Sequence, residues 1–321
     1  MDKIKRNGFV LAISNQKGGT GKTVTAENLG IGLVRAGKKV LLIDLDPQGS
    51  LTASLGVDTP DNLEVTVTTM MEHMINEDDF NPYEAIIHQE EGVDLLPGNI
   101  DLSALDVALV NVMSREQILR GYIDRVKDDY DIVIIDCMPS LGMLTINAIT
   151  AADMVIIPVQ PAYLSVRGLQ QLLVSIGKIR RRLNPDVKIA GILLTMVDNR
   201  TNYAKDIIET VNEAYADKIK VFQFNIPMSV RAAETSAEGS SLYVYDPNGI
   251  MSGGANFSGL PMIKLVEELR EVQGKMDGVN EEINELKEKL AAMGDNQKKI
   301  NDNQKRLDEL LKKQNEFNKE I

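Results

Sequence analysis

The stretch Ser14–Thr23, "SNQKGGTGKT", decides the fold class of this chain. Its end fits the phosphate-loop pattern G-x-x-x-x-G-K-[ST], but Gln16 stands where the first glycine belongs, and Lys17 follows it. A glycine-rich turn used only for tight packing is the plainer alternative. An apolar strand pattern at 9–14 precedes the turn and a helical pattern at 21–36 follows it, which is the context of a phosphate loop.

The loop predicts a binding site for ATP and Mg²⁺. Backbone N–H groups of such a turn converge on phosphate oxygens, and the helix N-terminus adds a favourable dipole. We expect Lys22 to reach the β- and γ-phosphates and the hydroxyl of Thr23 to ligate Mg²⁺. The expected nucleotide-binding residues are Gly18, Gly19, Thr20, Gly21, Lys22, Thr23 and Val24.

Short apolar runs rich in β-branched residues alternate with helical patterns along the chain. Because these runs are apolar on both sides, they predict parallel strands covered by helices on both faces. The expected fold is α/β, a doubly wound, mostly parallel sheet of the P-loop NTPase type. Strands are expected at 9–14, 40–45, 131–136, 154–159 and 189–196, with weaker candidates at 93–97 and 221–227, and helices at 21–36, 114–127, 140–151, 164–183 and 203–216.

Carboxylates follow two of the expected strands. Asp136 ends the apolar run "DIVIID", and Asp44 and Asp46 end "VLLIDLD". One such residue alone is explained by helix capping, but two acidic strand ends beside a phosphate loop indicate a magnesium site, since Mg²⁺ takes oxygen ligands and keeps several waters. We expect Thr23, Asp44 and Asp136 at this site.

Composition limits the classes of partner. The 321 residues carry a formal net charge of −12, so the chain as a whole should be repelled by nucleic acid and anionic lipid, and any DNA binding needs local basic patches or an assembled oligomer. No run approaches the ~18 apolar residues of a membrane span. The single cysteine, Cys137, excludes an internal disulfide and suits a reducing compartment. These features predict a cytoplasmic protein.

The pattern changes near Pro261. From Leu265 to the end, apolar residues recur in steps of four and three, which predicts a coiled-coil extension (265–321) after an ATPase domain (1–264). One amphipathic helix packed on the domain is the alternative, although it would measure roughly 85 Å. Turn-forming residues at 294–297 ("GDNQ") leave open whether the extension is a long parallel dimer or an antiparallel hairpin folding back at Gly294. The clearest flanking pair for a dimer is Glu282 with Lys287.

Beyond these patterns, the sequence resembles the ParA/Soj partition ATPases. The resemblance rests on the signature "KGGTGKT" (17–23), on "LIDLDPQGS" (42–50) and on "DYDIVIIDCMPSLGMLTINAI" (129–149). It continues through "TMVDNRTN" (195–202) and "IPMSVRAAETSAEGSSLYVYDP" (226–247) and covers about residues 8–270. Such proteins carry the loop variant K-G-G-x-G-K-[ST], so Gln16 is not a defect.

The resemblance assigns roles to three residues. It implies that Lys17 contacts phosphate across a nucleotide-sandwich dimer, so ATP would favour the dimer and hydrolysis would weaken it. It implies that Asp46 positions or activates the attacking water. Asp136 would act on Mg²⁺ through water. Asp44 would support Mg²⁺ or the switch segment, the loop after residue 45 that carries Asp46. Lys17, Lys22 and Asp46 are therefore the expected catalytic residues.

The resemblance also implies partners. The ATP-bound homodimer would bind DNA non-specifically through Arg200 and Arg231, and "KIRRR" (178–182) adds Arg180 and Arg181 as candidates. A ParB-like protein on a centromere-like site would trigger hydrolysis and release, so the protein would be associated with the nucleoid when ATP is bound. The alternative is a nucleotide-gated scaffold that positions a protein cargo through a coiled-coil partner of the tail. A membrane-cycling role of the MinD kind is disfavoured, because the tail mixes both charge signs.

Overall fold

The computed structural model describes residues 8–198, 200–222 and 224–247, together with Glu282, Glu285, Lys305, Arg306, Asp308, Glu309, Leu310 and Lys312. For 163–167, 233, 236 and 237 it describes the backbone only. The chain divides into two compact units, residues 1–263 and 264–321. Most of the predicted coiled coil lies outside the described residues.

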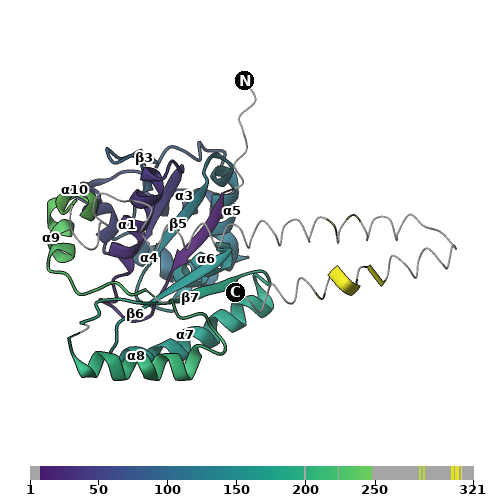
Figure 1. The fold of residues 1–321 in the computed structure, drawn as a ribbon. Coiled ribbons are helices and arrows are strands. Elements are labelled where there is room, and N and C mark those ends of the chain that lie inside the picture. Colours follow the sequence, from purple (N-terminus) through teal and green to yellow (C-terminus); the bar gives the residue numbers. More distant parts are fainter. Residues whose placement is uncertain are drawn as a thin grey trace. The chain divides into compact units, whose positions relative to one another are not determined.

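A seven-stranded sheet forms the centre of the first unit (Figure 1). Its strand order is β3-β4-β2-β5-β1-β6-β7, and all neighbours pair in parallel except β3 and β4. The strands are β1 (Phe9–Ile13), β2 (Val40–Leu45), β3 (Ile87–His88), β4 (Asp94–Leu96), β5 (Ile132–Cys137), β6 (Met154–Val159) and β7 (Lys188–Leu194). The predicted doubly wound, mostly parallel sheet is confirmed.

The sheet is covered on both faces because successive strand residues point to opposite sides. Leu41 and Ile43 of β2 belong to a buried core cluster with side chains of α3, α5 and α6. Leu42 between them lies against Gly30 of α1, on the other face. The helices are α1 (Lys22–Arg35), α2 (Ser50–Ser54), α3 (Val67–Asn76), α4 (Leu102–Ala108), α5 (Ile118–Val126), α6 (Met143–Ala151), α7 (Tyr163–Arg182), α8 (Asn202–Tyr215), α9 (Arg231–Glu238) and α10 (Leu242–Tyr245).

Several boundaries differ from those expected. The helix predicted at 114–127 is a 3₁₀ turn (Arg115–Gln117) followed by α5, and the helix predicted from 140 begins at Met143. The weak strand at 221–227 is wrong, since the described residues of this stretch form isolated bridges and not a strand, from Val221 to Ile192 and from Pro227 to Val197. Pro227 has no N–H to donate to a ladder, which explains part of this difference.

The strand order places the site. β1 lies between β5 and β6, so the strand order reverses at β1. In such sheets, ligands bind outside the carboxyl ends of the strands at the point of reversal. The loops that follow β1, β2 and β5 all emerge there. They carry the glycine-rich loop, Asp46 and the segment after Asp136.

Candidate nucleotide-binding site

The glycine-rich loop joins β1 to α1 in a conformation that only glycine adopts readily. Gly19 and Gly21 have φ values of 68° and 76°, in the left-handed region. Gly21 is the N-cap of α1, so the first free backbone N–H groups of this helix face the loop. The loop therefore has the backbone geometry that binds anionic phosphates.

Gln16 has a structural task in place of the missing glycine. Its side-chain amide donates a hydrogen bond of 2.6 Å to the carbonyl oxygen of Gly168 in α7 and lies 3.2 Å from Oε1 of Gln171. The neighbouring Asn15 donates to the carbonyl oxygen of Pro158 at 2.6 Å and accepts from the N–H of Lys17. These bonds attach the start of the loop to β6 and α7.

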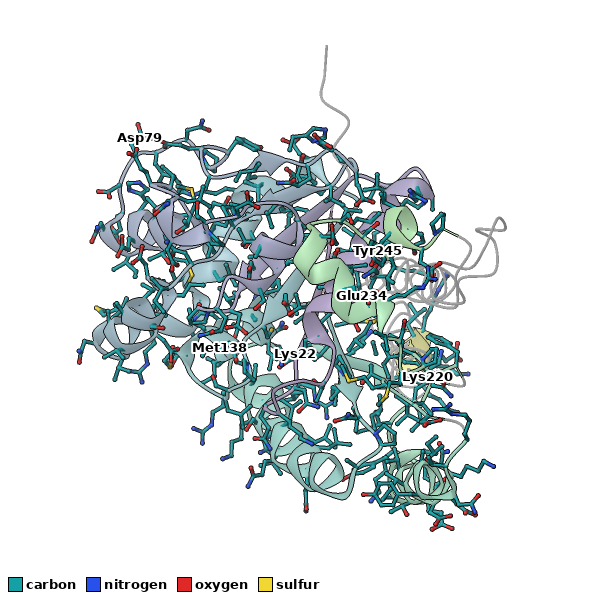
Figure 2. The ribbon with its side chains drawn as sticks, turned by 90° about the vertical axis from the view of Figure 1, so that its left-hand side faces the viewer. Lys22, Asp79, Met138, Lys220, Glu234 and Tyr245 are labelled. Carbon is teal, nitrogen blue, oxygen red and sulfur yellow. The ribbon has the colours of Figure 1, made fainter. Side chains whose placement is uncertain are left out.

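Lys22 lies inside the site. It is 6% exposed, and its Nζ is 3.3 Å from the carbonyl oxygen of Lys17. Burial lowers the pKa of Lys22, whereas nearby Asp136 and Asp46 oppose this shift. Figure 2 shows Lys22 within the body of the domain, far from Asp79 and Lys220 at its rim. A phosphate anion bound next to it would strongly stabilise the charged form of this buried ammonium group.

Thr23 and Asp136 form the centre expected to hold a cation. The Thr23 hydroxyl donates a hydrogen bond of 2.7 Å to Oδ2 of Asp136, whereas Oδ1 of Asp136 is buried and has no hydrogen-bond partner. Burial raises the pKa of Asp136 to about 8, and nearby Asp44 adds to this shift. A divalent cation or its water would satisfy the free oxygen and favour the carboxylate form. The residues therefore fit Mg²⁺.

The carboxylate of Asp44 makes hydrogen bonds to residues that follow β2. It is fully buried, and its Oδ2 accepts hydrogen bonds of 2.8 Å from both the N–H and the hydroxyl of Thr52 in α2. Its Oδ1 accepts from the N–H of Asp46 at 3.2 Å. Burial raises the pKa of Asp44 to about 6, against these hydrogen bonds. The contacts support its expected role in holding the switch segment more than direct metal ligation.

Lys17 and Asp46 lie at the open side of the site. Both side chains are half-buried, and Oδ1 of Asp46 accepts a hydrogen bond of 3.0 Å from the N–H of Gln48. Among the residues that the structure describes, no three His, Cys, Asp or Glu side chains gather to hold a metal ion. A magnesium ion here would therefore draw its remaining ligands from phosphate and water, as is usual for this ion.

An apolar pocket of about 450 Å³ adjoins the loop. It has the size of a small-molecule site and lies against the N-terminus of α1, where a nucleoside attached to the phosphates would extend. Sequence reasoning named Gly21 and Val24 here but missed the other walls, most of which come from two segments of the quoted resemblance, 195–202 and 226–247. The pocket is lined by Gly21, Val24, Thr25, Thr195, Met196, Ile226, Pro227, Met228, Ser229 and Ala232.

The site also has a buried acid that sequence reasoning did not find. Glu27 in α1 is 0% exposed, and neither carboxyl oxygen has a partner at hydrogen-bonding geometry. Burial raises its pKa to about 8, whereas the nearby Ser54 side chain opposes this shift. The polar pattern of α1 gave no signal that this residue would face inward.

The four candidate DNA-binding arginines come from different elements of the fold. Arg180 and Arg181 lie in the last turn of α7, which precedes β7, whereas Arg200 follows the end of β7 and Arg231 begins α9. The guanidinium of Arg200 makes two hydrogen bonds to Asp198, of 2.8 and 2.9 Å, which lower the pKa of that carboxyl to about 2. Arg231 pairs with Asp246 at 2.9 Å. Two of the four charges are thus balanced within the domain.

Comparison with known proteins decides the family. A family profile described as "AAA domain" matches residues 8–189. The chain is 43% identical over 241 residues to the sporulation initiation inhibitor protein Soj of Bacillus subtilis (strain 168), covering 75% of this chain and 92% of Soj. This chain belongs to the ParA/Soj family of ATPases. It is also 41% identical to the chromosome partitioning protein ParA of Myxococcus xanthus, over 74% of this chain and 82% of that one.

A solved structure of another protein has a similar fold. A Mycobacterium smegmatis structure described as cobyrinic acid a,c-diamide synthase with bound ADP and magnesium is similar at a TM-score of 0.65 and 38% identity, covering 75% of this chain and 96% of that chain. About a quarter of this ParA/Soj chain thus lies outside what these relatives match.

No helix among the described residues is long and apolar enough to cross a membrane.

Proposed function

We propose that this protein is an ATP-driven switch for DNA partition. ATP and Mg²⁺ bind at the glycine-rich loop, two copies close over the nucleotides, and the closed dimer binds DNA without sequence preference. A ParB-like protein on a centromere-like site stimulates hydrolysis, which releases the DNA. Family membership and a solved relative with bound ADP and magnesium support the nucleotide part of this proposal.

One observation carries the proposal: the buried, unpartnered Oδ1 of Asp136 beside the hydroxyl of Thr23. Leaving this oxygen without a partner costs free energy in the unliganded domain, so a cation that enters the site removes a penalty as well as adding attraction. Thr23 and Asp136 would hold Mg²⁺ and its waters, and Lys22 would hold the terminal phosphates. Asp46, at the open side, would orient the attacking water.

Lys17 would couple nucleotide to assembly. Its backbone is held in the loop by hydrogen bonds with Asn15 and Lys22. A lysine that reaches into the partner's site stabilises phosphate only when nucleotide and both copies are present, so ATP shifts the equilibrium towards the dimer. Loss of the γ-phosphate removes much of that stabilisation.

DNA binding would depend on assembly. Each copy carries a formal net charge of −12, and both Arg200 and Arg231 form ion pairs within it. Exposed ion pairs are weak, however, and a phosphate can replace the carboxylate. A dimer doubles the number of such contacts, and its affinity should fall steeply as salt rises, because phosphate contacts release counterions.

Size measurement with and without ATP–Mg²⁺, followed by DNA retention at increasing salt, tests the proposal. The expected result is a nucleotide-dependent dimer that binds unrelated DNA sequences equally and is released by salt. If ATP–Mg²⁺ yields neither dimers nor salt-sensitive retention, the partition role is wrong.

A second candidate is a nucleotide-gated scaffold for a protein cargo. The observation that favours it is the internal pairing of Arg200 and Arg231, together with the quarter of the chain that lies outside the match to Soj. Deletion of residues 272–321 separates the two candidates. A scaffold would lose its partner protein, whereas a DNA switch would keep ATP-dependent DNA binding.

A further inference from the structure

A cavity of about 360 Å³ lies between α6 and α7, which pack on each other on one face of the sheet (Figure 1). It shares no lining residue with the pocket beside the glycine-rich loop. Ser175 of its wall lies seven residues beyond Gly168, the residue that accepts from Gln16, and so roughly 10 Å further along α7. The cavity is therefore a second concave site, separate from the one that binds nucleotide.

The walls of this cavity are mostly apolar. Leu141, Ile146 and Ile149 line it from α6 and the segment before that helix, and Ile179 and Leu183 line it from α7 and its C-cap. Ile149 and Ile179 belong to the buried core, so packing fixes this part of the wall. Small-molecule sites have this composition, with volumes from about 300 to 1,000 Å³ and a few polar groups that orient the ligand. The cavity therefore suits the apolar body of a compact ligand.

Two cations lie at the rim of the cavity. Lys178 and Arg182 both line it and are exposed, and one helical turn separates them, so they lie on the same face of α7. In the part of the chain that the structure describes, neither side chain forms an ion pair. Like charges at this spacing repel each other, so an anion placed between them would be attracted by both.

The other charges near the cavity do not cancel this pair. Glu116 lines the cavity from the turn before α5, but its Oε1 already accepts from Nε of Arg115 at 3.2 Å. Arg180 and Arg181 lie at the same helix end and do not line the cavity. Cations near a helix C-terminus are favourable in themselves, which is enough to explain these two. The rim of the cavity is therefore positive in a chain whose formal net charge is −12.

A buried hydroxyl in the wall lacks a hydrogen bond. Thr145 of α6 is 1% exposed and lines the cavity, and its Oγ1 has no partner. A threonine in a helix often donates to the carbonyl oxygen one turn earlier, and Thr145 does not. An unmade hydrogen bond of a buried hydroxyl costs free energy, which an oxygen atom of a ligand would recover. Two cations and a hydroxyl donor thus favour a ligand that carries anionic oxygen.

We propose that the cavity between α6 and α7 binds a small organic anion with an apolar body and one carboxylate head group. The body packs against the leucine and isoleucine side chains, Lys178 and Arg182 hold the head group, and Thr145 donates to a ligand oxygen. A helix of a partner protein does not fit this cavity, because a helix with its side chains measures about 10 Å across. DNA phosphates would use the two cations but leave the apolar walls empty.

Calorimetric titration of the full-length, nucleotide-free protein with decanoate tests this proposal. Saturable binding at one site per chain is the expected result. The uncharged decanamide should bind at least about tenfold more weakly, because it lacks charge-assisted hydrogen bonds to the two cations. Excess ADP should leave the affinity for decanoate unchanged, since the cavity is separate from the nucleotide site. The binding does not depend on the partition role, so the two proposals fail independently.

Matched variants separate the cavity from the basic helix end around it. Lys178→Gln/Arg182→Gln should weaken decanoate binding by about tenfold or more and leave decanamide binding unchanged. Arg180→Gln/Arg181→Gln removes the same charge from the same end of α7 outside the cavity, and salt screens such exposed charges, so the affinity should change by less than about twofold. Thr145→Val keeps the shape of the side chain and should weaken decanoate binding by about three- to tenfold.

Several results would overturn the site. One is the absence of saturable binding up to about 1 mM decanoate, and another is displacement of decanoate by ADP. Equal losses in the two double variants would assign the binding to the general charge of the helix end. Sedimentation with phosphatidylglycerol vesicles that is lost in Lys178→Gln/Arg182→Gln would assign the two cations to a membrane surface. Loss of ATP-dependent DNA retention in that variant, with decanoate binding unchanged, would assign them to DNA.

Discussion

The side-chain amide of Gln16 lies 2.6 Å from the carbonyl oxygen of Gly168, so the residue that breaks the standard phosphate-loop pattern fastens the loop to α7. The bond spans 152 positions of sequence. Gly168 is closely approached: an added Cβ there would lie 3.0 Å from the Gln16 amide nitrogen. The loop is therefore held at its start by a tertiary contact.

Replacement of Gln16 by glycine should weaken ATP binding, although it restores the standard pattern. The variant loses a hydrogen bond of about 1 kcal/mol and gains backbone freedom, so we expect an affinity loss of roughly fivefold. Titration with a fluorescent ATP analogue measures it. Gln171→Ala, which removes only the longer contact of 3.2 Å, is the control and should change little. Tighter binding by Gln16→Gly would contradict the anchoring role.

The two loop lysines should fail in different ways. Lys22→Ala should abolish productive nucleotide binding, because the buried ammonium is lost from the site. Lys17→Ala should retain binding to the single copy but lose the ATP-dependent dimer, as followed by light scattering on a sizing column. Lys205→Ala, an exposed lysine on α8, controls for the change in net charge. An intact ATP dimer in Lys17→Ala would refute the role across the dimer.

Asp136→Asn should remove most of the dependence of ATP affinity on magnesium. The amide cannot stabilise the cation as a carboxylate does, so the increase in ATP affinity that Mg²⁺ produces should fall by about 10- to 100-fold. ATP titrations with Mg²⁺ and with a chelator measure this difference. Thr23→Ser keeps the hydroxyl that donates to Asp136 and should behave like the natural protein. If the effect of Mg²⁺ on ATP affinity is unchanged in Asp136→Asn, the cation binds at another site.

Asp46→Ala should separate binding from hydrolysis. We expect normal ATP binding and dimerisation, with turnover slowed by about a hundredfold or more if the carboxylate positions the attacking water. Phosphate release under single-turnover conditions is the measurement. Gln48→Ala, which leaves the carboxylate in place, serves as the control, since it keeps the N–H that bonds to Asp46. Rapid hydrolysis in Asp46→Ala would assign the catalytic role to another residue.

Glu27 should make stability depend on pH. Its pKa in the folded state is raised to about 8 from an ordinary value of 4.5, so the folded protein keeps a proton that the unfolded chain loses. The stabilisation is therefore full below pH 4.5 and is lost as the pH rises towards 8. Glu27→Gln should flatten this decline in the free energy of unfolding, measured by denaturant titration between pH 5 and 8.5. The exposed Glu72→Gln is the matched control, and an identical decline in both variants would contradict the assignment.

Much of the fold followed from local patterns. Strands β2 and β6 were predicted with their observed bounds, because parallel strands buried on both faces are continuous apolar runs with clear ends. Helices α2, α3, α4, α9 and α10 were not predicted. They hold at most ten residues, and α2, α9 and α10 pack on α1 or on one another, which a local pattern does not report.

By itself, the sequence determined the phosphate loop, the strand-end acids and the family, because each is a short pattern in which residue type and spacing set the chemistry. Only the tertiary structure decided which oxygens remain free. It left Oδ1 of Asp136 without a partner and buried Glu27 in the domain. These outcomes depend on desolvation and on contacts between segments distant in the chain, and no local pattern encodes either.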